Sequence, residues 1–167
     1  ICRINGNQTF SPMYRIVLKE MLTPTICRMK VEASRLASAA LPGQFLIIRA
    51  DEQGERIPLT ISDFDKDEGT VTIVTQKIGA STSEICSYEE GDSFADVVGP
   101  LGIPSDFTEI PDEELAGKRY VFIAGGVGTA PVYPQVKWLH ERGAKVDVII
   151  GAKTSGLVIY KEEMSAV

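Results

Sequence analysis

Short runs in which apolar and polar residues alternate follow one another from Met13 to about Val98. Six of these runs are rich in β-branched residues and are separated by turn signals such as Pro42-Gly43, so each is predicted to be a strand. The predicted strands cover residues 14–20, 25–32, 44–50, 57–63, 70–76 and 92–98. One helix is expected after Gly79, in the stretch STSEICSY. Six short strands without long helices between them predict an antiparallel barrel or sandwich.

The periodicity changes after residue 114. The stretches RYVFIAGG (119–126) and AKVDVIIGA (144–152) are predicted to be buried strands, and residues 129–143 between them have a helical pattern that Gly143 closes. A strand, a helix and a strand with apolar strands predict a parallel βαβ unit. The expected fold is therefore an antiparallel six-stranded β-barrel followed by a parallel α/β domain.

The domain boundaries are expected in the Gly- and Pro-rich segment 99–111 and just after it. We predict an extension or tag-like segment at 1–12, a barrel domain at 13–114 and an α/β domain at 115–167. A doubly wound sheet needs more than two parallel strands, so the second domain is expected to be incomplete. Either the chain is part of a longer protein, or a partner chain covers the open edge.

Composition and charge narrow the function classes. Apolar residues make up 44% of the chain and charged residues 24%, and the net charge of −6 argues against nucleic acid and anionic membranes as partners. No apolar run has the length of a membrane span, and no signal-peptide pattern is present, so a cytoplasmic protein is expected. Cys2, Cys27 and Cys86 fit no metal-ligand spacing and are expected to be free thiols; no metal site is expected.

The stretch AGGVGTAP (124–131) follows a predicted strand and precedes a predicted helix. Gly125, Gly126 and Gly128 allow a tight turn and a close approach of backbone to a ligand, Thr129 is expected to cap the helix, and Pro131 suits its first turn. A phosphate or ribose could then bind at the helix start. The alternative is a purely structural turn, since the third glycine of the dinucleotide fingerprint is missing and no acidic residue ends the second strand.

Two upstream stretches also carry candidate chemistry. In RIPLTIS (56–62), Pro58 removes a ladder donor, so the strand could aim Arg56 and Thr60 at a ligand; the alternative is an exposed arginine on an edge strand. In KIGASTSEI (77–85), Gly79 precedes small hydroxyl residues at a helix start, a composition that cradles a pyrophosphate. The alternative there is a helix with a serine cap.

The order of these segments resembles the ferredoxin–NADP reductase superfamily, in which a barrel holds a flavin and an α/β domain holds a nicotinamide nucleotide. The branch it resembles most is the small subunit of the NADH-dependent reduced ferredoxin:NADP oxidoreductase and sulfide dehydrogenase type, with the dihydroorotate dehydrogenase electron-transfer subunit as a near cousin. The matching stretches are LPGQFLIIR (41–49), ERIPLTISDFD (55–65), VGPLGIPS (98–105), AGGVGTAPVYP (124–134) and IIGAKT (149–154).

The resemblance implies the cofactors FAD and NAD(H) or NADP(H), and a role for each candidate residue. Arg56 would pair with the FAD diphosphate, and Thr60 would approach flavin N5 as the catalytic residue. Residues 79–82 would hold the pyrophosphate through backbone N–H groups and hydroxyls, and the glycine turn would lie under the nicotinamide nucleotide. The residues expected along the flavin are Pro58, Leu59 and Ile61; at the pyrophosphate, Gly79, Ala80, Ser81 and Thr82; and under the nicotinamide nucleotide, Gly125, Gly126, Gly128, Thr129 and Pro131. Leu59 precedes Thr60 where many members of the superfamily have an aromatic residue, so aliphatic groups would cover the flavin.

The function implied is the passage of hydride and electrons between a nicotinamide nucleotide and iron–sulfur carriers. The expected partners are a larger oxidoreductase subunit and a ferredoxin-like carrier, and an iron–sulfur cluster is expected only in residues downstream of Val167. The alternatives are an electron-transfer subunit of dihydroorotate dehydrogenase, a truncated FAD-binding module without turnover, and a cofactor-free barrel. The choice between NADH and NADPH stays open.

Overall fold

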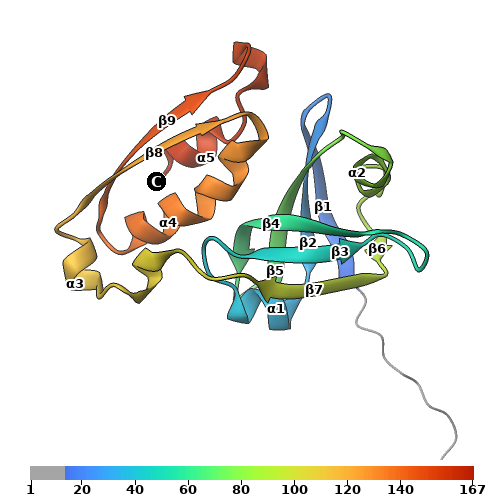
Figure 1. The fold of residues 1–167 in the computed structure, drawn as a ribbon, viewed down its shortest axis with the longest axis horizontal. Helices are drawn as coiled ribbons and strands as arrows, with labels where there is room; N and C mark the ends of the chain where they lie inside the picture. Colours follow the sequence, from blue (N-terminus) through green and yellow to red (C-terminus); the bar gives the residue numbers. More distant parts are fainter. Residues whose placement is uncertain (1–13) are drawn as a thin grey trace, which may run out of the picture.

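The computed structural model describes residues 14–167, in two parts that lie side by side (Figure 1). The predicted extension at 1–12 and Cys2 lie outside the described residues. One part is an antiparallel sheet curled into a nearly closed barrel, and the other is a small parallel sheet with helices on one face. None of the helices in residues 14–167 is long and apolar enough to cross a membrane.

The barrel confirms the predicted antiparallel fold and adds one strand. Its strand order is β6-β1-β2-β5-β4-β3-β7. The predicted strand 92–98 is divided at Ala95, because its first part pairs with β1 and its second part with β3. This one run therefore connects the two edges of the sheet and nearly closes it. The seven strands are β1 (Tyr14–Thr23), β2 (Ile26–Glu32), β3 (Phe45–Arg49), β4 (Arg56–Asp65), β5 (Thr70–Gln76), β6 (Ser93–Phe94) and β7 (Asp96–Leu101).

The barrel core consists of the inward-facing residues of these strands, at every second position as the alternation requires. Two short helices pack against the barrel: α1 (Ser34–Ala39), which the sequence pattern did not indicate, and α2 (Ala80–Ile85), which was predicted. The largest fully buried side chains of the core are Ile16, Met29, Val31, Leu46, Ile48, Ile61, Val71, Ile73 and Ile85.

The second part contains the predicted parallel βαβ unit. Strands β8 (Arg119–Gly125) and β9 (Lys145–Gly151) pair in parallel, and α4 (Tyr133–Glu141) connects them. The remaining elements are η1 (Asp106–Glu109), α3 (Asp112–Leu115), η2 (Gly126–Val132), η3 (Ser155–Leu157) and α5 (Lys161–Ser165).

Two details of this unit differ from expectation. The α-helix expected from Thr129 begins only at Tyr133, after a 3₁₀ segment, because Pro131 and Pro134 have no N–H for the early α-helical hydrogen bonds. The strands were expected to be buried on both faces, yet Ile123 is 77% exposed and Ile149 57% exposed. In residues 14–167 only one face of this sheet packs on helices.

A shared apolar interface holds the two parts together. Ile26 and Val74 of the barrel pack in one cluster with Ala130, Val136 and Tyr160 of the α/β part. The segment η2 lies against β4 and β5, so the glycine turn is brought to the barrel strand that carries RIPLTIS.

Candidate functional site

Strand β4 changes partners halfway along its length. Residues Arg56–Thr60 pair with β3, whereas Ile61–Asp65 pair with β5. Pro58 lies opposite Ile47 of β3, in the half that has no strand on its other side. A proline is tolerated at such a local edge because no ladder donor is needed there. The open side of this half of β4 is therefore available to a ligand.

The side chains of this open half alternate between the two faces of the strand. Arg56 and Pro58 are exposed and Thr60, at the next position of the same face, is partly exposed. Leu59 packs against the barrel core, and Ile61 is 1% exposed within it. The period of two turns both side chains toward the barrel core, and a role for Leu59 and Ile61 along a flavin stays a prediction.

Arg56 has an acidic partner that the sequence pattern did not reveal. Its Nη2 lies 2.8 Å from Oδ2 of Asp96 at the start of β7. The Arg56 side chain is 52% exposed and that of Asp96 28% exposed. A guanidinium has five N–H donors, so Arg56 can keep this ion pair and still donate to an added anion. Arg49 of β3 lies opposite Arg56 of β4 on one side and opposite Asp96 of β7 on the other. This register brings Arg56 and Asp96 together.

The start of α2 lies beside the start of β4. The Ser81 hydroxyl hydrogen-bonds to the carboxylate of Glu55, the residue before Arg56. The Thr82 hydroxyl oxygen accepts hydrogen bonds from the backbone N–H of Ile78 at 3.0 Å and of Gly79 at 3.1 Å. Residues 79–82 and Arg56 are thus neighbours in the fold. Glu55 is a second acidic group that the sequence reasoning missed, although it directly precedes the arginine.

The glycine turn has one position that requires glycine and one that depends on close packing. Gly126 has a φ of +56°, in the region that favours glycine. A Cβ on Gly125 would lie 3.2 Å from the carbonyl oxygen of Gly151, so glycine lets β8 and β9 approach at their ends. A Cβ on Gly126 or Gly128 would meet no atom within 4 Å, which leaves free space above the turn.

Thr129 does not have the predicted capping role. The residue that precedes η2 is Gly125, and no side chain caps the segment. Thr129 is fully buried, and its hydroxyl has no hydrogen-bond partner among the described residues. Thr129 lies inside the 3₁₀ segment, four positions before α4 begins, so it does not stand at the start of the α-helix.

An ion pair couples the α/β part to the far end of β4. Lys137 Nζ of α4 lies 2.9 Å from Oδ1 of Asp63, and both side chains are half-buried. Burial is the largest single effect and would lower the pKa of Lys137, but the hydrogen bond to the Asp63 carboxylate and the nearby negative charges together outweigh it, so the pKa is raised. Strand β4 therefore contacts α4 near its end, and Glu55, the residue before its start, contacts α2.

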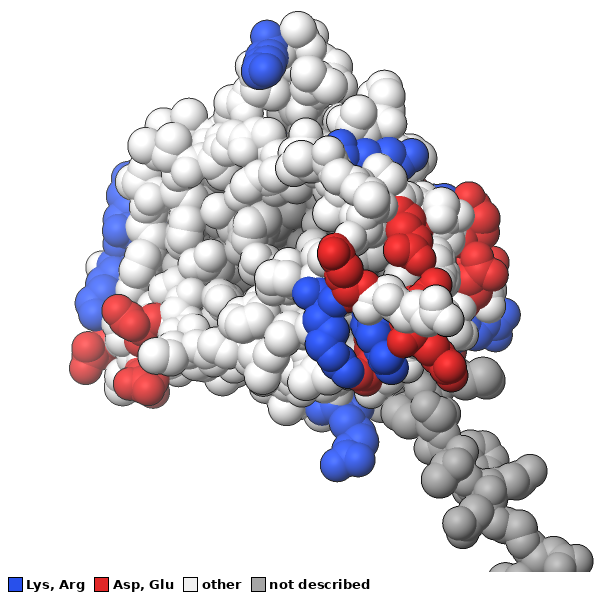
Figure 2. Space-filling view, turned by 45° about the vertical axis from the view of Figure 1, so that its right-hand side comes forward, with Lys and Arg blue, Asp and Glu red and all other residues white. Residues whose placement is uncertain are grey.

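The space-filling view shows a face with a hollow near its centre and charged side chains gathered around the margin (Figure 2). Uncharged residues line the hollow. In residues 14–167 no group of three or more His, Cys, Asp or Glu side chains could hold a metal ion. Arg56 and residues 79–82 offer groups that bind an anion, and the exposed Pro58 offers an apolar contact to a ligand.

Comparison with solved structures defines the class of protein. No family model matches the chain. The structure of an NADH-dependent reduced ferredoxin–NADP oxidoreductase, described as a flavin-based electron-bifurcating enzyme, superposes with a TM-score of 0.84 at 35% identity, over 92% of this chain and 54% of that one. Phthalate dioxygenase reductase superposes with a TM-score of 0.70 at 17% identity, over 91% and 47% of the two chains, and shares the fold. The chain therefore has the ferredoxin reductase-like fold.

Curated relatives make the assignment more specific. The chain is 36% identical over 152 residues to a homolog of the electron transfer subunit of dihydroorotate dehydrogenase B from Thermotoga maritima, covering 91% of this chain and 51% of that protein. It is 31% identical over 139 residues to the corresponding subunit from Fusobacterium nucleatum, covering 81% and 52%. An uncharacterized Clostridium beijerinckii protein is 56% identical over 153 residues, covering 92% and 52%. Two of these three relatives are named as electron transfer subunits, and the chain spans about half of the length of each relative.

Proposed function

We propose that this chain is the FAD-binding and nicotinamide-nucleotide-binding portion of an electron-transfer oxidoreductase subunit. The observation that carries the proposal is the convergence on β4 of three segments, Arg56–Thr60, the start of α2 and the glycine turn. When bound, FAD would accept a hydride from a nicotinamide nucleotide and release electrons one at a time. The protein residues would supply binding and orientation.

The charge and the hydrogen-bonding groups of these segments support the fit to FAD. Arg56 would neutralise part of the diphosphate while it stays near Asp96. Residues 79–82 would add backbone N–H groups and hydroxyls once Thr82 turns away from the N–H groups of Ile78 and Gly79. Glu55 would have to move away from the diphosphate, since two negative groups repel each other.

The flavin ring would lie on the open side of β4. Pro58 presents an exposed apolar surface there, and the hydroxyl of Thr60 on the same face would hydrogen-bond near N5. Leu59 and Ile61 would support the strand from the barrel side. This arrangement assigns the ring contacts to the outward-facing positions of the strand.

The nicotinamide nucleotide would lie over the glycine turn. The free space above Gly126 and Gly128 permits close approach to the backbone, and Pro131 keeps the turn rigid. Thr129 would support the turn through its buried side chain. In this proposal residues 13–114 form the flavin domain, and residues 115–167 belong to the nucleotide domain, whose exposed apolar face on β8 and β9 offers a surface to further structure.

The partners proposed are a larger oxidoreductase subunit and a ferredoxin-like carrier. The names of the relatives favour two settings, a ferredoxin–NADP oxidoreductase and a dihydroorotate dehydrogenase. A binding module without turnover is the remaining candidate, because the chain covers only about half of each relative.

An absorption spectrum followed by anaerobic reduction tests the proposal. Purified protein supplied with FAD and then desalted is expected to keep a flavin spectrum, and NADH or NADPH is expected to bleach it. Retained flavin that neither nucleotide reduces would support the binding module. Failure to retain any flavin in a folded protein would contradict the proposed function altogether.

A further inference from the structure

Two buried cysteines meet where α2 packs on the barrel. Cys27 lies within β2 and Cys86 directly follows α2, 59 residues further along the chain. Their Sγ atoms are 2.8 Å apart, with exposed fractions of 0% for Cys27 and 1% for Cys86. They are the free cysteines of residues 14–167. A disulfide has an S–S length of about 2.05 Å, so a shift of less than about 1 Å would bring the sulfurs to bonding distance.

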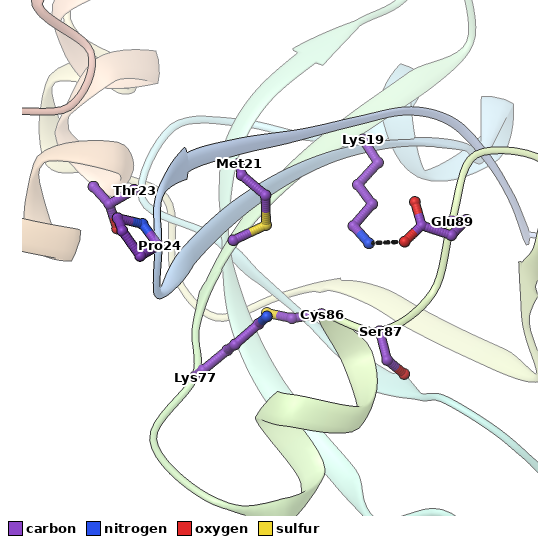
Figure 3. Close-up of a pocket in the computed structure, with 8 residues that line it drawn as sticks. All are labelled: Lys19, Met21, Thr23, Pro24, Lys77, Cys86, Ser87 and Glu89. Atoms are coloured by element: carbon purple, nitrogen blue, oxygen red, sulfur yellow. Dashed lines mark hydrogen bonds and ion pairs between the residues drawn. The ribbon is translucent and has the colours of Figure 1, made fainter.

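A groove of about 740 Å³ leads to this pair (Figure 3). Its walls come from β1, from the turn after it and from the residues around α2, and Cys86 is one of its lining residues. Met21 lies across the groove from Cys86, and Lys19 Nζ pairs with Glu89 at 2.5 Å on the wall. A small reagent in solvent therefore has a path to Cys86, while Cys27 lies behind it in the barrel.

The charges around the groove favour Cys86 as the sulfur that reacts first. The hydrogen bond from Cys27 and the positive charges of Lys77 and Lys19 lower the pKa of Cys86, against the opposing effect of burial. The same hydrogen bond together with burial raises the pKa of Cys27. The thiolate is the reactive form of cysteine, and Cys86 is the more acidic of the two. Cys86 is also the one that lines the groove.

We propose that Cys27 and Cys86 form a redox-active pair that a peroxide converts into an intramolecular disulfide. Cys86 attacks one peroxide oxygen, and its sulfur becomes a sulfenic acid as the other oxygen leaves as water. The Cys27 sulfur then attacks the Cys86 sulfur, the S–S bond forms and a second water leaves. Two thiols and one hydrogen peroxide thus yield one disulfide and two waters, and a dithiol reverses the change.

The disulfide would fix α2 to the barrel. Helix α2 has six residues and buries Ile85, so its attachment depends on few contacts. The bond would join strand β2 to the end of this helix and close a long loop, which reduces the freedom of the unfolded chain. This inference does not depend on flavin binding, and its readouts require no cofactor.

Mass spectrometry of a Cys2→Ser variant tests the proposal, because this variant leaves only the two paired thiols. The folded variant is treated with hydrogen peroxide, and it is then denatured and alkylated. The expected result is loss of both alkylatable thiols, a mass lower by about 2 Da and a Cys27–Cys86 cross-linked peptide, all reversed by dithiothreitol. Two thiols that remain alkylatable, or sulfinic acids without a cross-link, would overturn it.

A second measurement separates fixation of α2 from simple oxidation. Oxidation of the Cys2→Ser protein is expected to slow hydrogen exchange of the amides in residues 80–86 and to raise the Tm by several degrees. The matched control carries Cys86→Ala in addition, and peroxide should change neither quantity in it. A cross-link that leaves exchange in α2 unchanged would refute the fixation of the helix.

Discussion

Removal of the Arg56 guanidinium should weaken FAD binding, and the strength of the lost charged hydrogen bond sets the size of the effect. Hydrogen bonds from a charged donor are worth about 1.5–3 kcal/mol each, and a tenfold change in affinity corresponds to about 1.4 kcal/mol. Arg56→Ala is therefore expected to raise the Kd for FAD roughly 10- to 150-fold. The substitution should have little effect on folding, since the side chain is 52% exposed and its pairing with Asp96 is an exposed ion pair worth about 1 kcal/mol or less.

The assay is titration of the apoprotein with FAD, with urea denaturation of each variant in parallel. Arg119→Ala is the matched control, because Arg119 is also an exposed arginine in an ion pair, with Asp147, on the other part of the molecule. Asp96→Asn should leave the affinity unchanged or strengthen it up to roughly fivefold, since it frees the guanidinium from a competing partner. Equal Kd values for the wild type and Arg56→Ala would refute the assignment of Arg56 to the diphosphate.

Three further predictions concern stability. Lys137→Met and Asp63→Asn should each lower the free energy of unfolding by about 1 kcal/mol. The double variant should lose no more stability than the less stable of the two single variants. Additive losses in urea denaturation would show that the ion pair does not couple the two parts. Gly69→Ala should lower the free energy of unfolding by about 1–3 kcal/mol, because Gly69 has a φ of +68° and an added Cβ would lie 2.4 Å from a serine hydroxyl. The control Gly156→Ala, in open space, should change it by less than about 0.5 kcal/mol. Equal losses in the two variants would contradict this. Backbone N–H groups of the turn that follows Asp65 hydrogen-bond to its carboxylate and lower its pKa. Its contribution to the stability of the fold is therefore present above about pH 4 and is lost as the pH falls through the lowered folded-state pKa. Asp65→Asn should therefore lose less stability than the wild type between pH 7 and pH 2, and parallel pH profiles would count against that role.

The candidate site was only partly predictable. The segments 56–62, 77–85 and 124–131 could be found because glycine, proline and hydroxyl residues mark unusual backbone, and the structure brings all three to β4. The motifs did not indicate that Leu59 and Ile61 turn toward the barrel core, and the capping role predicted for Thr129 was wrong. Side-chain direction depends on register and on the helix type that two prolines impose, and neither is visible in a motif.

Local pattern was sufficient for the type and order of most elements, although it did not indicate α1. The alternation of residues 14–76 marks strands and the longer period of residues 129–143 marks a helix, because burial of one face selects the same spacing in any fold. The partners of each element depended on contacts between distant residues. The split of one predicted strand between two edges of the barrel, the pairing of Arg56 with Asp96 and the meeting of Cys27 with Cys86 all depend on contacts between residues 40–80 positions apart in the sequence. No local period encodes such contacts, since they form only when the whole chain packs.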